Sequence, residues 1–148
     1  MSSSGLIVRR SERFEISIPS RVRVAAYHTE LLHFVKGVTD AERWIEVDLI
    51  DFATGGVGFI IDVFMPRNLD LELEIPDFDD PKGGEVMLRC QMKVKRVQMT
   101  DRRPAYQIGC SFIDIDGQIQ DSIDKLTTRL RGMAEDGTSE GGQDVGYL

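Results

Sequence analysis

The chain has 148 residues, of which 41% are hydrophobic and 29% are charged, values typical of one globular domain with a single core. Its net charge of −7 argues against a general nucleic-acid binder, whose affinity would depend on a basic surface. No apolar run approaches the roughly 20 residues of a membrane-spanning helix, and the N-terminal sequence lacks the pattern of a secretory signal, so a cytoplasmic location is expected.

The charge is distributed unevenly along the chain. Residues 1–23 carry five arginines against two acidic residues, whereas residues 133–148 carry four acidic residues and no basic one. A basic start on an acidic protein indicates a local anion site. We expect a flexible leader over residues 1–8, a folded domain over 9–131 and a disordered, acidic, glycine-rich tail over 132–148, because the tail has too few apolar residues to order itself.

The first predicted strand runs from Phe14 to Val24. Its apolar residues alternate with polar ones on either side of Pro19, which predicts a long, half-buried strand bent at the proline. The following segment, residues 27–43, is compatible with a second short strand or with a helical turn followed by a loop.

Two apolar runs, 44–50 and 57–61, flank an acidic and glycine-containing segment, 51–56, and this pattern predicts two strands joined by a tight turn. Paired glycines in such a turn can adopt positive φ angles and allow a ligand to approach closely. Residues 69–75 then alternate strictly between apolar and acidic side chains, which predicts a strand with one face in water.

Two further alternating runs, 86–94 and 106–112, complete a set of about six predicted strands. The period changes only near the end, where Ile119, Ile123, Leu126 and Leu130 recur at helical spacing before Gly132, which is expected to end the helix. The fold class expected is mainly β: a six-stranded antiparallel β-barrel with a C-terminal helix.

No arrangement in the sequence indicates catalysis or metal binding. Cys90 and Cys110 lie singly in predicted strands and are expected to be buried, reduced thiols. His28 and His33 lack ligands at a recognised metal spacing. No serine or cysteine is placed beside a histidine as a nucleophile would be, so we expect neither an enzyme nor a metal site.

A second informative stretch is Arg9-Arg10-Ser11-Glu12-Arg13, just before the first predicted strand. A guanidinium group is planar, always charged and able to bind phosphate or a guanine edge through two hydrogen bonds, so three of them in five residues could form an anion clamp. The chain contains Arg9-x-x-x-Arg13 followed by Asp51-x-Ala53-x-x-Gly56, and this pair closely resembles the two-part signature of PilZ domains, RxxxR and (D/N)xSxxG. The resemblance extends over roughly residues 9–131.

PilZ domains are six-stranded antiparallel barrels, often with a C-terminal helix, that bind the bacterial second messenger cyclic di-GMP. The resemblance therefore implies a cytoplasmic, bacterial, non-enzymatic receptor. In it, Arg9 and Arg13 would bind phosphate and the guanine Hoogsteen edge, and Arg10 would stack or add a phosphate contact. Asp51 would accept hydrogen bonds from the guanine N1–H and N2–H. The implied ligand-binding set is Arg9, Arg10, Arg13, Asp51, Ala53, Gly55 and Gly56.

Ala53 departs from the family pattern, which has serine at this position. Losing the hydroxyl removes one hydrogen bond, at a net cost on the order of 1 kcal/mol, so weakened but retained binding is expected. Binding would draw the Arg9–Arg13 segment onto the barrel and create a surface for a protein partner in trans. The alternatives are a PilZ-like interaction adaptor that has lost its ligand and, disfavoured by the charge and the 7% aromatic content, a single-stranded nucleic-acid binder.

Overall fold

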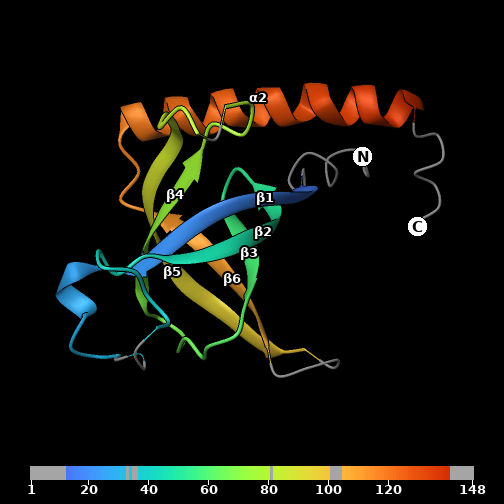
Figure 1. The fold of residues 1–148 in the computed structure, drawn as a ribbon. Helices are drawn as coiled ribbons and strands as arrows, with labels where there is room; N and C mark the ends of the chain where they lie inside the picture. The colour runs from blue at the N-terminus through green and yellow to red at the C-terminus, as the bar shows by residue number, and fades with distance from the viewer. Residues whose placement is uncertain (1–12, 33, 35–36, 81, 101–104, 141–148) are drawn as a thin grey trace, which may run out of the picture.

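The computed structural model describes residues 13–32, 34, 37–80, 82–100 and 105–140, with backbone only from residue 135 on. Six strands form a closed barrel in the order β1-β2-β3-β6-β5-β4, and all neighbouring strands are antiparallel (Figure 1). The strands are β1 (Arg13–Val24), β2 (Ile45–Ala53), β3 (Gly56–Ile61), β4 (Asp70–Pro76), β5 (Val86–Met99) and β6 (Tyr106–Ile113). The predicted fold class is confirmed.

The barrel is filled by the apolar side chains that alternate along each strand. Phe52 of β2 and Phe59 of β3 are fully buried, together with leucines and isoleucines of β4, β5 and β6. The segment after β1 contains a short 3-10 helix, η1 (Ala26–His28), and then turns and loop among its described residues, so the helical-turn alternative is the one observed.

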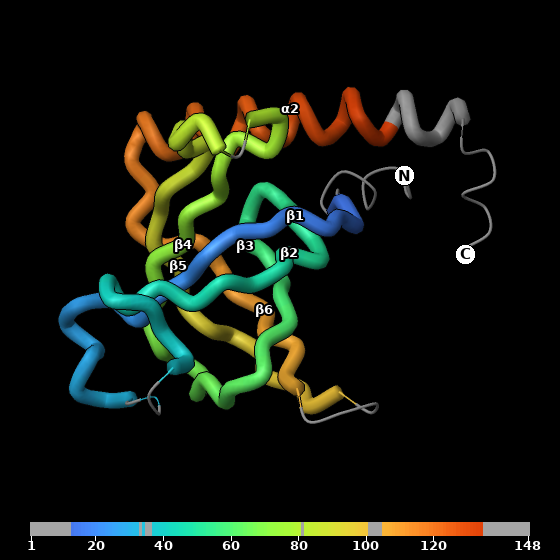
Figure 2. Tube along the Cα trace, in the orientation of Figure 1, coloured from blue at the N-terminus to red at the C-terminus, as the bar shows by residue number. Residues whose placement is uncertain are grey.

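Helix α2 (Gly117–Glu140) crosses one end of the barrel and continues past it (Figures 1 and 2). Ile123, Leu126 and Leu130 are buried beneath it. Arg129 attaches the helix to the β4–β5 connection, because its guanidinium lies 4.5 Å from the ring centre of Phe78 and forms ion pairs with Asp77 and Asp79.

The predicted end of this helix at Gly132 is wrong. The helix continues to Glu140, so residues 132–140 of the expected disordered tail are helical; residues 141–148 lie outside the described residues. Glycine inside a helix costs about 1 kcal/mol relative to alanine. This cost does not end the helix here, because the preceding turns pack on the barrel and the next residues, Met133 and Ala134, favour helix.

The polar face of β4 is also not the wet surface that its sequence predicts. Asp70 and Glu74 are 6% and 4% exposed. Glu74 accepts hydrogen bonds from Nε of Arg21 at 2.7 Å and Nε of Arg89 at 2.9 Å. The two arginines lie on the strands either side of β4, so closure of the barrel buries this carboxylate between its neighbours.

This ion-pair network predicts acid-sensitive stability. Burial raises the pKa of Glu74, but hydrogen bonds from Arg21 and Arg89 outweigh it, so the pKa lies below its ordinary value of 4.5. The unfolded chain therefore binds this proton more readily, and the stabilisation is complete above pH 4.5 and is lost as the pH falls through the folded-state pKa. We expect Glu74→Gln to reduce the loss of unfolding free energy with acid, measured by urea unfolding from about pH 6 to pH 3. Glu30→Gln, which removes an exposed carboxylate outside this network, is the matched control.

Candidate functional site

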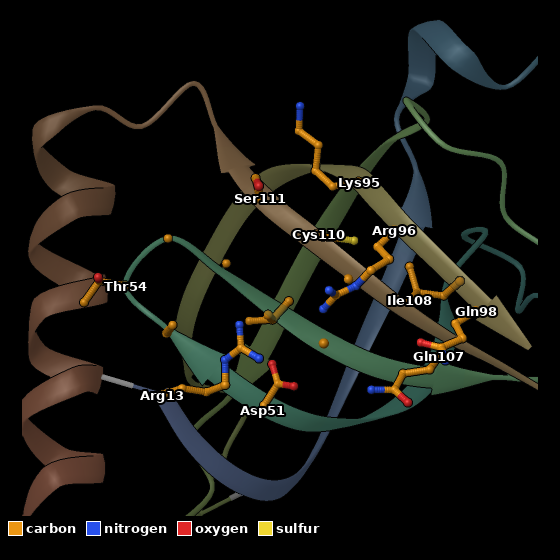
Figure 3. A pocket seen from close by; sticks show the side chains of 16 residues that line it. Arg13, Asp51, Thr54, Lys95, Arg96, Gln98, Gln107, Ile108, Cys110 and Ser111 are labelled. Carbon is orange, nitrogen blue, oxygen red and sulfur yellow. The ribbon is translucent and has the colours of Figure 1, made fainter. Parts of the chain in front are cut away.

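An open cleft of about 540 Å³ lies on the outer face of the barrel, across β2, β3, β6 and β5 (Figure 3). Four charged residues border it: Arg13 of β1, Asp51 of β2, and Lys95 and Arg96 of β5. Its remaining lining residues are Ala53, Thr54, Gly55, Gly56, Val57, Gly58, Gln98, Gln107, Ile108, Gly109, Cys110 and Ser111.

A β-bulge in β2 turns Asp51 toward the cleft. Leu49 pairs with Phe59 and Asp51 pairs with Gly58, so Ile50 is one extra residue on β2. The bulge reverses the alternation, and Leu49 and Phe52 both point into the core although they are three residues apart. In a regular strand without the bulge, Asp51 would share the inward face of Leu49 and its carboxylate would lie in the core.

A second bulge, in β5, exposes two consecutive cations. Val94 pairs with Cys110 and Arg96 pairs with Gly109, so Lys95 is the extra residue. Val94 is fully buried, whereas Lys95 and Arg96 are both exposed. Figure 3 shows the side chain of Arg96 directed over the cleft and that of Lys95 directed away from it.

The two bulges bring Asp51 and Arg96 into one row across the sheet. Asp51 pairs with Gly58, Gly58 with Gly109, and Gly109 with Arg96. The two adjacent glycines form a floor without side chains. A β-carbon at Gly58 would stand 2.9 Å from both carboxylate oxygens of Asp51, so the absence of a side chain there leaves room for this carboxylate.

The residues of the first predicted motif are only partly described. Arg9 and Arg10 lie outside the described residues. Arg13 begins β1 and pairs directly with Ala53 of β2, so barrel closure places the end of the first motif beside the second. The guanidinium of Arg13 and the carboxylate of Asp51 project over the same part of the sheet (Figure 3).

The turn itself differs from its prediction. Strands β2 and β3 extend to Ala53 and Gly56, so only Thr54 and Gly55 form the loop. Neither Gly55 nor Gly56 adopts a positive φ angle. A β-carbon at Gly56 would lie 1.9 Å from the carbonyl oxygen of Cys110, so this glycine allows β3 and β6 to approach each other. At Gly55 a β-carbon would meet no atom within 4 Å.

The cleft is suited to an anion that also offers hydrogen-bond donors. None of the described carboxylates forms an ion pair with Arg13, Lys95 or Arg96. Arg13 and Arg96 project into the cleft and are therefore available for phosphate, whereas Lys95 points away from it; Asp51 is a pure acceptor for paired N–H groups such as those of guanine.

Several lining residues were not anticipated from the sequence, namely Gly58, Lys95, Arg96, Gln98, Gln107, Gly109 and Ser111. A signal for the bulges was present. The apolar residues Leu49 and Phe52 are three positions apart, and so are Val94 and Val97, whereas residues on one face of a regular strand are two apart.

Other chemistry finds little support in the described part of the chain. Its histidine, cysteine and acidic side chains form no group of three that could hold a metal ion. Cys90 and Cys110 are buried free thiols, as expected, and burial raises the pKa of each to about 12. None of the helices over these residues has the length and apolar content to cross a membrane.

The fold and the cleft together define a closed six-stranded barrel with a charged cleft on its outer face and a helix across one end. The sequence matches the family described as PilZ domain over residues 7–129, and the chain belongs to that family. No curated protein is significantly similar to it.

Solved structures share the fold at low sequence identity. The PilZ domain with c-di-GMP of YcgR from Escherichia coli is 13% identical with a TM-score of 0.55, over 88% of this chain and 98% of that one. The K. pneumonia MrkH–c-di-GMP complex is 16% identical with a TM-score of 0.57, over 84% and 52%. The Bacillus subtilis inhibitor of motility, MotI/DgrA, is 11% identical with a TM-score of 0.55, over 80% and 49%. The chain thus spans about half the length of the MrkH and MotI/DgrA chains.

Proposed function

We propose that this chain is a cytoplasmic bacterial receptor for cyclic di-GMP with no enzymatic activity. The observation that carries the proposal is the meeting of Arg13 and Asp51 over one cleft, in a chain that belongs to the PilZ family. The structures of YcgR and MrkH with c-di-GMP support the choice of ligand.

In this proposal the two parts of the signature have different tasks. Asp51 lies on a rigid strand and selects guanine by accepting hydrogen bonds from N1–H and N2–H, donors that adenine does not present in this arrangement. Arg9, Arg10 and Arg13 supply the charge that holds phosphate and the guanine Hoogsteen edge. Ala53 and Gly55 border the ligand, while Gly56 acts by allowing close strand packing.

The proposed output is a change of surface. Binding draws the Arg9–Arg13 segment onto the cleft, and a protein partner recognises the surface that results. No specific contact of the described residues identifies that partner.

The direct test is a calorimetric titration of cyclic di-GMP into the wild type and into Arg13→Ala. Wild-type binding should be saturable, and loss of a charged phosphate contact of about 1.5–3 kcal/mol should weaken it about 10- to 100-fold. Arg67→Ala is the matched control, because Arg67 is exposed and does not line the cleft. A wild type that shows no binding at high micromolar ligand contradicts the proposal.

A second prediction concerns Ala53, the departure from the family pattern. Ala53→Ser should restore one hydrogen bond and tighten cyclic di-GMP binding several-fold, on the order of 1 kcal/mol, by the same titration. Thr54→Ala is its control, since the Thr54 side chain lies in the turn at the end of the hairpin (Figure 3) and should not replace the missing hydroxyl. Equal affinity of Ala53→Ser and wild type would show that the serine position is not used in this chain.

Ala53 also favours the second candidate, a PilZ adaptor that no longer binds ligand. That role predicts that Arg9→Ala and Arg13→Ala leave partner binding unchanged. A pull-down with an identified partner, with and without cyclic di-GMP, separates the two functions, because only the receptor requires the ligand and the arginines.

A further inference from the structure

Arg96 is the residue of the cleft whose placement depends most on the tertiary structure. It is exposed, and the β5 bulge at Lys95 turns it onto the outer face. Its side chain leans over β6, so that its Nε and Nη2 atoms lie 3.7 and 3.8 Å from the place that a β-carbon on Gly109 would occupy. The guanidinium therefore lies over the glycine floor and is directed toward the middle of the cleft (Figure 3).

The opposite side of the cleft carries the other described guanidinium that points into it. Arg13 extends from β1 beside Ala53, and the Asp51 carboxylate lies against Gly58 at the edge of the glycine floor. The row from Asp51 to Arg96 spans three strand-to-strand steps, about 14 Å between backbones, and both terminal side chains lean inward. A ligand lying on Gly58 and Gly109 would thus have the Asp51 carboxylate and Arg13 on one side and the Arg96 guanidinium on the other.

We propose that Arg96 binds a phosphate of the ligand from the side opposite to Arg13. This inference rests on the proposed function and extends its site to β5. Cyclic di-GMP carries two phosphodiester groups on one ring, so a ligand whose guanine meets Asp51 presents one phosphate to the Arg13 side and the other toward β6 and β5. The planar guanidinium can donate two parallel hydrogen bonds to that second phosphate.

The structure supplies two matched comparisons. Lys95 has the same charge and lies on the same bulge, but its side chain points away from the cleft. Gly109→Ala places a methyl group at ordinary contact distance, 3.6 Å or more, from the Arg96 side chain, so it should fold normally while raising the floor beneath the ligand.

The experiment is a calorimetric titration of cyclic di-GMP into wild type, Arg96→Met, Arg96→Lys, Lys95→Met, Gly109→Ala and Arg13→Ala, with thermal unfolding of each unliganded variant. Arg96→Met should bind about tenfold or more weakly, and Arg96→Lys should fall between it and the wild type. Lys95→Met should stay within about twofold, since it removes only a screened, distant charge. Gly109→Ala should weaken binding without lowering the unfolding temperature.

Ionic strength separates a phosphate contact from a structural role. Raising salt to about 1 M shortens the screening length to about 3 Å, so the affinity gap between wild type and Arg96→Met should narrow. A gap that does not change with salt overturns the proposed contact.

The failures are distinguishable. If wild type binds and Arg13→Ala loses binding while Arg96→Met equals wild type or Lys95→Met, the role of Arg96 is wrong and the receptor function stands. If wild type does not bind, the receptor function is wrong and the role of Arg96 falls with it.

Discussion

Replacing Gly56 with alanine is expected to destabilise the fold by about 3 kcal/mol, because overpacking against the rigid backbone of a neighbouring strand has no cheap relaxation. The new β-carbon would stand 1.9 Å from the carbonyl oxygen of Cys110, and β3 and β6 would have to separate at this point. Urea unfolding of the unliganded protein measures the effect. A fall in ligand binding by this variant would then report damaged strand pairing and not a lost ligand contact.

Gly55→Ala is the control for this prediction. It lies next to Gly56 in the same motif, but a β-carbon there meets no atom within 4 Å and the residue has no positive φ angle. Its unfolding free energy should stay within about 0.5 kcal/mol of wild type. Equal stability of the two variants would show that the close approach of β3 to β6 is not required.

Removing the Asp51 carboxylate is expected to have the largest effect on the proposed ligand binding. Asp51→Ala should weaken cyclic di-GMP binding by about 100-fold or more, since two hydrogen bonds to a charged acceptor are lost together. Titration calorimetry gives the affinity, and cyclic di-AMP provides the specificity control because adenine does not offer the same pair of donors. Wild-type binding of both nucleotides with equal affinity would contradict a guanine-selecting role for Asp51.

Two further variants separate the position of this carboxylate from its charge. Asp48→Ala removes an exposed carboxylate from the same strand outside the cleft, and it should leave the affinity unchanged. Gly58→Ala retains Asp51 but places a β-carbon 2.9 Å from its carboxylate oxygens, so the side chain must move. We expect weaker binding from Gly58→Ala with little loss of stability, because the atoms that must shift are the end of a flexible side chain.

The receptor and adaptor roles differ in what the cleft is for. In both, the barrel and α2 are the same scaffold, and the family membership does not choose between them. Arg13 and Arg96 face the cleft without a carboxylate partner among the described residues and favour the receptor, whereas the methyl group of Ala53 favours the adaptor. The Ala53→Ser titration therefore bears on both.

The sequence by itself determined the succession of strands and helix along the chain, and with it the fold class. Alternation, short apolar runs and helical spacing of apolar residues are local properties, and together they located all six strands and the core-facing part of α2. The spacing of Arg13 and Asp51 within their motifs also indicated the family and two charged residues that the structure brings to one cleft. The two motifs are more than thirty residues apart, and only the pairing of β1 with β2 makes them neighbours.

Only the tertiary structure determined which residues of different strands are neighbours on the barrel and which way they face. Bulges at Ile50 and Lys95 depend on the register of each strand against its partners, which is a long-range property, and they determine that Asp51 and Arg96 face outward. Closure of the barrel buried Glu74 between two arginines, although its strand pattern is that of a wet face. The pairing of β3 with β6 in the closed barrel likewise leaves no room for a side chain at Gly56, and the turn sequence around this glycine does not reveal that contact.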